Sequence, residues 1–324
     1  MDRRHFLALS GATMGGAAIG GASTLAGAHD TGFPHEHLPS GIPVPTGKLL
    51  RRTIPSTGET LPAIGLGTSG PFEVTGDEQA RAPLREVLQG FFTGGASLID
   101  TSPMYSTAEA VLGDLLTPEQ QAKVFLATKV WTPGSGGHGQ AKGIEQMQRS
   151  MALLKHKRIE LMQVHNLVDL DVHLRTLRQW KDDGRIKYLG VTHYTTSSYP
   201  DLIGIIEREK LDFVQFNYSV GTREAEKKLL PLCANKGVAV IVNRAFEDGN
   251  LFTRVQGKTL PAWAAEFGAR SWAQVFLKFV LAHPAVTCVI PATGKIRNLV
   301  DNLGAGVGPL PDAKQRAQIV AAVG

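Results

Sequence analysis

Short apolar runs alternate with longer amphipathic segments over most of the chain. The apolar runs are four to six residues long, a length typical of buried strands, and eight of them occur. They lie at 63–66, 97–100, 124–128, 159–164, 188–191, 213–216, 238–242 and 287–290. Helical periodicity fills the intervals, most clearly at 78–92, 143–154, 172–182 and 272–281. Strands separated by helices predict parallel pairing through right-handed crossovers.

Eight strand–helix units in about 250 residues match the size of a TIM barrel. We therefore predict an α/β fold, a (β/α)8 TIM barrel preceded by a β-hairpin with strands at 51–54 and 61–64. The competing architecture is an open doubly wound sheet, which places a Gly-rich turn after its first strand. Residues 65–70 match that turn, G-x-G-x-x-G, literally. Because Pro71 follows and no helical pattern opens at the third glycine, we interpret the match as accidental.

The first 28 residues have the pattern of an export signal. Arg3 and Arg4 come shortly before Phe and Leu, an uncharged stretch rich in Gly and Ala runs to residue 28, and 26–28 form a cleavage site of small residues. The twin arginine resembles a Tat signal, which predicts the Tat export machinery as a partner and a periplasmic or other extracytoplasmic location. If the signal is not used, the location is the cytoplasm. The stretch is too diluted by small residues to predict a stable membrane span.

The mature chain divides into three parts. Residues 29–48 are rich in Pro, Gly and His without periodicity, which predicts a linker. The barrel then covers 49–310, and 311–324 form a C-terminal helix and tail, with the helix at 313–323. No long loop follows the barrel pattern, so we expect an open pocket that takes small substrates.

Composition and charge narrow the function classes. The 324 residues are 43% hydrophobic and 19% charged, which is ordinary for a soluble globular protein. The net charge of +5 comes without a Lys/Arg block outside the N-terminus, so no nucleic-acid partner is predicted. Cys233 and Cys288 form no CxxC or metal-ligand cluster, and no metal site is predicted. The sequence leaves open whether the two cysteines are oxidised and which oligomeric state the protein adopts.

Four residues with useful chemistry lie at or just after the ends of predicted strands: Asp100, Tyr105, Lys129 and His165. The carboxyl ends of barrel strands meet at the mouth, where active sites lie, so these side chains are predicted to converge. Reduction of a carbonyl needs a hydride on carbon and a proton on oxygen. A phenol can donate the proton, and a neighbouring ammonium lowers the pKa of the phenol.

The sequence around these residues resembles the aldo-keto reductases, whose tetrad is Asp, Tyr, Lys and His in this order. Residues 98–105, with Glu109 four positions on, resemble the family signature Asp-Thr-Ala-x-x-Tyr-x-x-x-Glu. Residues 184–191 resemble Gly-Lys-Ile-Arg-x-Ile-Gly-Val, and the resemblance extends over about residues 50–305.

The resemblance implies a role for each member of the tetrad. Tyr105 is the general acid, Lys129 tunes it, Asp100 orients Lys129, and His165 positions the carbonyl. Glu109 is expected to anchor its loop rather than to catalyse. Schiff-base chemistry at Lys129 is the alternative, but it needs a deprotonated lysine, and a carboxylate partner at Asp100 opposes this.

The resemblance also implies NADP(H) as cofactor, with NAD(H) as the alternative, bound without a Rossmann fold. Gln215 matches the glutamine that holds the nicotinamide carboxamide, and Thr192-His193 replaces the Ser-Asn pair that also touches it. The family often has an aromatic after strand seven that stacks on the nicotinamide. Asn243 stands there in this chain, so we expect weaker stacking, with Arg244 reaching the pyrophosphate.

Further cofactor-binding candidates lie in the first strand, the loop over the cofactor, and the last strand with its helix: Gly67, Thr68, Leu251, Pro291, Thr293, Lys295, Arg297, Asp301 and Asn302. Lys295 and Arg297, at a helix amino end, suit a 2′-phosphate and favour NADP over NAD. Asn298 stands where the family often has a further arginine, which weakens that preference.

Together these features and the resemblance predict an NAD(P)H-dependent oxidoreductase acting on carbonyl or CH–OH groups. We expect it to reduce small aldehydes or ketones to alcohols by hydride transfer, with Trp131 as a wall of the substrate pocket. The alternative is a low-turnover NADP(H)-binding sensor or accessory subunit on the same barrel. Asn243 and the scarcity of free cofactor outside the cytoplasm favour it, whereas an intact tetrad argues against it.

Overall fold

The computed structural model describes residues 47–132 and 139–324. The predicted Tat signal at 1–28 lies outside these residues, as does the predicted linker except for Gly47 and Lys48. Export and the proposed domain boundaries therefore stay predictions.

Eight parallel strands form the central sheet and follow one another in chain order, as predicted for a TIM barrel. They are β3 (Leu66–Gly67), β4 (Leu98–Asp100), β5 (Phe125–Val130), β6 (Ile159–His165), β7 (Ile186–Thr192), β8 (Phe213–Asn217), β9 (Ala239–Asn243) and β10 (Val286–Val289). Isolated parallel bridges join Ile64 to Val289 and Gly67 to Ala292, so the first and last strands meet and the barrel is nearly closed.

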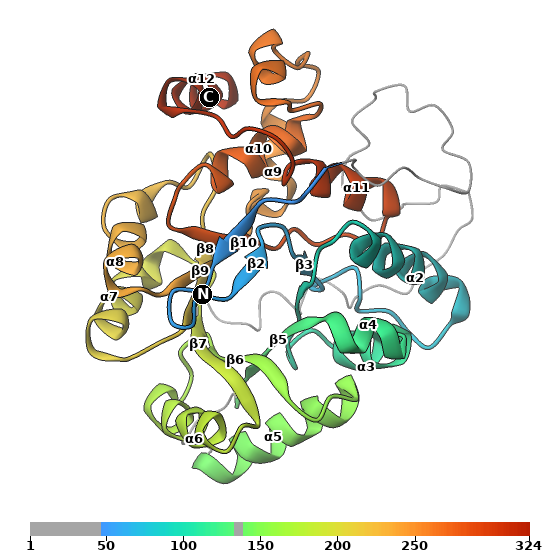
Figure 1. The fold of residues 1–324 in the computed structure, drawn as a ribbon, viewed down its shortest axis with the longest axis vertical. Helices are drawn as coiled ribbons and strands as arrows, with labels where there is room; N and C mark the ends of the chain where they lie inside the picture. The colour runs from blue at the N-terminus through green and yellow to red at the C-terminus, as the bar shows by residue number, and fades with distance from the viewer. Residues whose placement is uncertain (1–46, 133–138) are drawn as a thin grey trace, which may run out of the picture. The chain divides into compact units, whose positions relative to one another are not determined.

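Helices surround the strands as a ring (Figure 1). They are α2 (Glu78–Thr93), α3 (Ala108–Leu115), α4 (Pro118–Lys123), α5 (Gly139–Leu154), α6 (Leu170–Asp182), α7 (Tyr199–Arg208), α8 (Leu229–Lys236), α9 (Asn250–Arg254), α10 (Trp272–Leu281), α11 (Ile296–Gly304) and α12 (Ala313–Val323). The helices expected at 78–92, 143–154, 172–182, 272–281 and 313–323 are all confirmed, with ends within four residues of the predicted ones.

The period of two along each strand explains how the barrel positions a polar site. Residues that face the interior form an apolar layer near the amino ends of the strands, for example Leu98, Phe125 and Leu161. On the same inward faces, Asp100 comes two residues after Leu98, and Lys129 comes four residues after Phe125. Further polar side chains follow at the same end of the other strands. The opposite faces pack against the helices. One end of the barrel is therefore apolar inside, and the carboxyl end is polar.

The predicted hairpin is confirmed as β1 (Arg51–Thr53) paired antiparallel with β2 (Thr60–Pro62). Ile54 and Leu61 belong to the apolar cluster inside the barrel, and the hairpin crosses the centre of the ring in Figure 1. The hydroxyl of Tyr188 lies 2.8 Å from Oγ1 of Thr57 and donates to Glu59 at 3.0 Å. The hairpin thus covers the apolar end and leaves the polar end as the mouth.

The first barrel strand is shorter than predicted and begins later, at Leu66 instead of Ala63. Residues 63–65 still bond to the last strand, because Val289 donates to Ala63 and Gly65 donates to Val289. The segment passes from pairing with β10 to pairing with β4 within a few residues. A side chain at Gly65 would place its Cβ 2.8 Å from the carbonyl oxygen of Leu98, so this close passage requires glycine.

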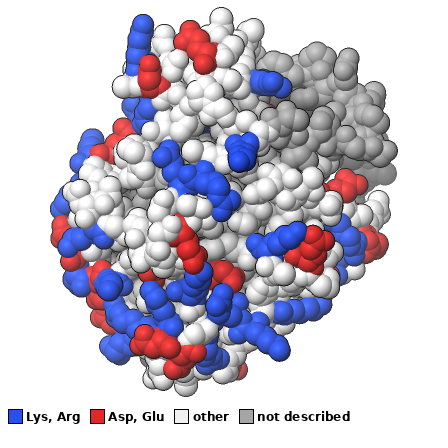
Figure 2. Space-filling view, in the orientation of Figure 1, with Lys and Arg blue, Asp and Glu red and all other residues white. Residues whose placement is uncertain are grey.

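The surface carries mixed charge. Lys and Arg lie among Asp and Glu over the face shown in Figure 2. Many charged side chains of the described residues pair, for example Lys187 with Glu59 and Lys181 with Asp212. This pattern is typical of a solvated surface rather than of a continuous basic stripe. Of the helices described, none combines the length and apolar character needed to cross a membrane. Cys233 and Cys288 are both buried and free.

Lys278 is a fully buried lysine. Among the residues that the structure describes, its Nζ donates only to two carbonyl oxygens, that of Val307 at 2.6 Å and that of Pro309 at 2.9 Å. Burial lowers the pKa of Lys278 from 10.5 to about 8. Between these two values the unfolded chain binds the proton more tightly than the folded chain does. The contribution of Lys278 to the free energy of unfolding should therefore rise with pH across this window.

Urea unfolding over that pH range, compared between wild type and Lys278→Met, isolates this contribution. The difference between the two proteins should change steadily from about pH 8 to about pH 10.5 and level off outside it. The exposed Lys314→Met on α12 is the control and should show no such change. Parallel curves for wild type and Lys278→Met would show that Lys278 does not titrate differently on folding.

Candidate active site

A buried ion pair lies at the centre of the mouth. Asp100 is the last residue of β4, and Lys129 is the last but one of β5, on the inward face. Nζ of Lys129 lies 2.6 Å from Oδ2 of Asp100 and donates to the carbonyl of Thr101 at 2.7 Å. Both side chains are almost completely buried. The pairing expected from the sequence is present, although β5 continues to Val130 and does not end at the lysine.

The second oxygen of Asp100 accepts two amide N–H groups. Nε2 of Gln215 donates to Oδ1 at 2.8 Å, and Nε2 of Gln163 donates to it at 3.2 Å. Gln163 was not among the predicted site residues. It lies midway between Leu161 and His165 on the inward face of β6, so the period of two could have identified it.

Tyr105 and His165 complete the group. Nζ of Lys129 lies 5.0 Å from the centre of the Tyr105 ring. The rings of Tyr105 and His165 meet edge to face with centroids 6.1 Å apart. Trp131, the predicted wall of the substrate pocket, also lies near His165, with ring centroids 6.5 Å apart. The four residues selected from the sequence therefore lie together at the mouth of the barrel.

Burial and charge act in opposite directions on the two central groups. Burial raises the pKa of Tyr105, and the charge of Lys129 offsets only part of this, so the phenol titrates above its ordinary range. Burial lowers the pKa of Lys129, but Asp100 and Tyr105 outweigh it, and the pKa of the ammonium lies above its usual value. The charge of Lys129 does lower the pKa of Tyr105, as expected from the sequence, but burial outweighs it and the net shift is upward. At neutral pH the site holds a neutral phenol beside a charged ammonium.

Glu109 anchors the segment that carries Tyr105, as predicted. Its carboxylate is buried at the start of α3 and accepts from Thr128 Oγ1 at 2.6 Å and from Ser150 Oγ at 2.9 Å. Burial raises the pKa of Glu109, and the two hydroxyls oppose this. Thr128 precedes Lys129 on β5, so Glu109 fixes the helix after Tyr105 against the strand of the lysine.

The residues predicted to hold a carboxamide form one network at the ends of β7, β8 and β9. Oε1 of Gln215 accepts from Thr192 Oγ1 at 3.0 Å and from Asn243 Nδ2 at 3.3 Å. Asn243 Nδ2 also donates to the carbonyl of His193 at 3.2 Å. These acceptors fix the orientation of the Asn243 amide, and its Oδ1 is buried without a hydrogen-bond partner among the described residues.

His193 supports its own loop. Its Nδ1 accepts from the backbone of Tyr194 at 3.0 Å and of Thr195 at 3.3 Å, and its ring stacks on that of Tyr194. Burial lowers the pKa of His193. The ring is therefore neutral at physiological pH and braces the turn after β7.

The candidates at the seam of the barrel also lie at the mouth. Thr68 donates to the carbonyl of Asp100 at 3.1 Å, and Gly67 pairs with Asp100 on β4. Gly67 donates to the carbonyl of Pro291 at 3.3 Å. Thr293 caps the turn before α11 by accepting from the backbone of Lys295 at 3.1 Å. The side chains of Lys295 and Arg297 are exposed at the amino end of that helix.

The remaining three cofactor-binding candidates have positions that support the fold. Oδ2 of Asp301 accepts from Ser271 at 2.7 Å and Oδ1 accepts from Gln274 at 2.8 Å, so its carboxylate joins α11 to the start of α10. Asn302 and Leu251 are buried. Their assignment to the cofactor stays a prediction, with less support than that of Lys295 and Arg297.

A hollow of about 270 Å³ opens beside the network, where β7, β8 and β9 end. Tyr194, Asn217 and Arg244 line it together with Thr195, Thr196, Tyr218, Thr222, Glu247 and Asn250. Arg244 crosses from the loop after β9, pairs with Asp248, and donates to the carbonyl of Tyr194 at 3.2 Å. Its guanidinium thus bridges two loops at the rim.

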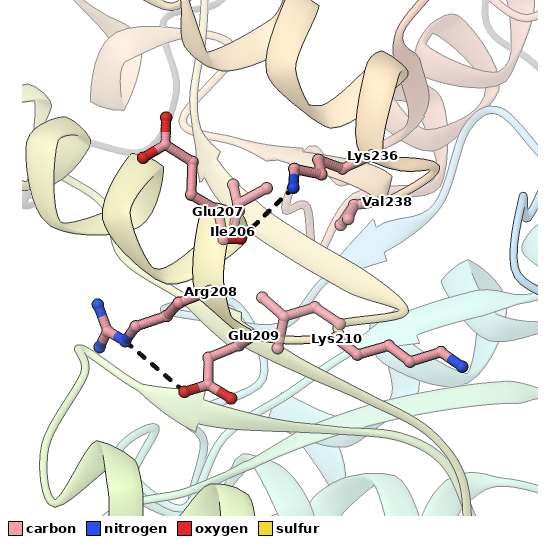
Figure 3. A pocket seen from close by; sticks show the side chains of 8 residues that line it. Ile206, Glu207, Arg208, Glu209, Lys210, Lys236 and Val238 are labelled. Atoms are coloured by element: carbon pink, nitrogen blue, oxygen red, sulfur yellow. Dashed lines mark hydrogen bonds and ion pairs between the residues drawn. The ribbon is translucent and has the colours of Figure 1, made fainter.

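A second hollow, shown in Figure 3, lies at the opposite end of β8 and β9, where Leu211 and Val238 precede the strands. Two of its charged side chains have contacts within the hollow: Lys236 donates to the carbonyl of Glu207 at 3.4 Å, and Arg208 lies 3.6 Å from Glu209. Being remote from the tetrad, it plays no part in the site.

The model of the Aldo/keto reductase family matches residues 63–322. The chain belongs to the aldo/keto reductase family. Members of this family are NAD(P)H-dependent oxidoreductases, and the tetrad predicted from the sequence is the group found at the mouth of this barrel.

Solved structures show the same fold at low sequence identity. An aldo-keto reductase of Bacillus halodurans in its holo form is 22% identical, with a TM-score of 0.68 over 85% of this chain and 96% of that one. An aldo-keto reductase of Klebsiella pneumoniae in complex with NADPH is 23% identical, with a TM-score of 0.67 over 85% and 94%. An aldo/keto reductase of Brucella melitensis is 19% identical, with a TM-score of 0.63 over 85% and 100%.

Proposed function

We propose that this aldo-keto reductase uses NADPH to reduce small aldehydes or ketones to alcohols, with Tyr105 as general acid. The observation that carries the proposal is the meeting of Tyr105, Lys129, Asp100 and His165 at one end of the barrel. When bound, NADPH supplies the hydride.

Each residue of the tetrad has one task in this reaction. Tyr105, held as the neutral phenol, donates its proton to the carbonyl oxygen. Lys129 stays charged and stabilises the phenolate that this donation leaves behind. Asp100 holds the ammonium in place and is itself held by Gln163 and Gln215. His165 lies against the Tyr105 ring and orients the oxygen towards the phenol.

The residues at the mouth fit a nicotinamide carboxamide. The buried Oδ1 of Asn243 lacks a partner among the described residues, and its orientation is fixed by His193 and Gln215. An amide N–H of the ligand would satisfy that oxygen. Asn243 would therefore provide a polar contact where many relatives provide an aromatic face. Gln215 would orient Asn243 by accepting from its Nδ2, and Thr192 would orient Gln215.

Lys295 and Arg297 suit the 2′-phosphate that distinguishes NADPH from NADH. Replacing both by methionine should weaken NADPH binding by at least about tenfold, because a hydrogen bond to a charged group contributes about 1.5–3 kcal/mol. NADH binding should stay near the wild-type value. Fluorescence titration with the two cofactors measures both, with Lys314→Met as the control. Equal losses for NADPH and NADH would show that these residues do not recognise the 2′-phosphate.

A panel of small aldehydes and ketones tests the proposed activity. We expect NADPH oxidation with several of them and weak activity with steroid-sized ketones. The alternative of a low-turnover sensor is not favoured, since the described structure contains the full catalytic group. Tight NADPH binding without oxidation on any carbonyl would reverse this preference.

A further inference from the structure

Ser102 lies between the two groups that act on the substrate oxygen. Its side chain is completely buried, and its Oγ lies 2.9 Å from Nδ1 of His165. The same Oγ accepts the backbone N–H of Met104 at 3.1 Å. The carbonyl of Ser102 accepts the backbone N–H of Tyr105 at 3.0 Å, which closes the turn that carries the acid.

The hydrogen bonds of Ser102 favour one of the two neutral tautomers of His165. A hydroxyl has one hydrogen and two lone pairs. The N–H of Met104 occupies one lone pair. A buried hydroxyl hydrogen needs an acceptor, and Nδ1 of His165 lies at hydrogen-bond distance. Nδ1 therefore accepts, and in the neutral imidazole the proton is on Nε2.

We propose that Ser102 is a positioning residue that holds His165 as the neutral tautomer protonated on Nε2. In this form Nε2 can donate a hydrogen bond to the carbonyl oxygen, while Tyr105 supplies the proton that is transferred. The other tautomer would present a lone pair to the substrate oxygen and repel it. The inference rests on the proposed function, because it assigns His165 to the substrate oxygen.

Ser102 is also a point where this chain departs from the family signature. The signature Asp-Thr-Ala-x-x-Tyr has alanine where Asp100-Thr101-Ser102-Pro103-Met104-Tyr105 has serine. An alanine could neither accept the N–H of Met104 nor donate to His165. The chain therefore carries its own means of selecting the tautomer and of fixing the turn before Tyr105.

Long-range ¹H–¹⁵N spectra of the protein labelled in histidine test the proposal directly. His165→Gln assigns the signals. Wild type should show the neutral form of His165 protonated on Nε2, and Ser102→Thr, which keeps the hydroxyl, should show the same. Ser102→Ala should shift His165 towards the other tautomer. Ser219→Ala is the matched control, because Ser219 is also buried and its Oγ also accepts a backbone N–H, from Thr222 at 2.8 Å. It should leave the His165 signals unchanged.

Kinetics provide a second measurement. Ser102→Ala should lower kcat for aldehyde reduction by roughly 5- to 10-fold, the effect of one lost hydrogen bond of about 1–1.5 kcal/mol. The KM for NADPH should not change, and Ser102→Thr should restore kcat.

The spectra separate failure of this inference from failure of the proposed function. A wild-type His165 protonated on Nδ1, or a tautomer that is the same in Ser102→Ala, overturns the inference whether or not the protein turns over aldehydes. The wild-type result can overturn the inference in this way even if Ser102→Ala does not fold. Absence of turnover with the predicted tautomer would instead count against the proposed reaction.

Discussion

Replacing Tyr105 by phenylalanine should lower the rate of aldehyde reduction by roughly a thousandfold, within the range found for loss of a general acid. The ring would keep its edge contact with His165 and its place beside Lys129, so the site should retain its shape. What is lost is the proton that must reach the carbonyl oxygen. Initial rates of NADPH oxidation measure the effect, and fluorescence titration should show NADPH affinity near the wild-type value.

Tyr188→Phe is the matched control for this substitution. It removes the same atom from a tyrosine at the opposite end of the barrel, where the hydroxyl bonds to Thr57 and Glu59 of the hairpin. We expect full activity and some loss of thermal stability. A Tyr105→Phe enzyme with rates close to those of wild type would show that another group donates the proton.

Replacing Lys129 by methionine should reduce both stability and activity. Asp100 would stay buried without its ammonium partner, and breaking one side of a buried ion pair typically costs about 3–5 kcal/mol. The amides of Gln163 and Gln215 would remain but carry no charge. Urea unfolding measures the loss. Lys155→Met, which removes an exposed partner of Asp114, should leave the free energy of unfolding almost unchanged.

The double variant Asp100→Asn/Lys129→Met separates the structural role from the catalytic role. Because no uncompensated charge remains, it should be more stable than Lys129→Met alone. Its reductase activity should stay as low, since nothing then stabilises the phenolate of Tyr105. Recovery of activity together with stability would mean that Lys129 only supports the fold.

The convergence of the tetrad could be predicted because it follows from strand order and strand ends. Asp100 and His165 end their strands as expected, and parallel pairing brings those ends to one side. Thr192, Gln215 and Asn243 were selected through the family resemblance instead, and the structure has them at or near the carboxyl ends of β7, β8 and β9. Alternating apolar runs and helical segments also predicted eight strands and the surrounding helices, because burial on both faces leaves a clear pattern.

Other features depend on distances that the pattern of residues does not contain. Ser102 and Gln163 become important through the atoms they face, Nδ1 of His165 and Oδ1 of Asp100. The net rise in the pKa of Tyr105 reflects the balance between desolvation and the charge of Lys129, which depends on how deeply the ring is buried. Asp301 bonds to α10 because of how two helices pack, and that packing is not specified by their separate periodicities.

The most direct test of the central claim follows deuterium from cofactor to product. The protein is incubated with a small aldehyde and NADPH carrying deuterium at C4 of the dihydronicotinamide ring, in both stereochemical forms. We predict an alcohol with one deuterium on the carbinol carbon from one of the two forms, and loss of that product in Tyr105→Phe. Bound NADPH without deuterated alcohol from any aldehyde tested would contradict the assignment of this site as a carbonyl reductase.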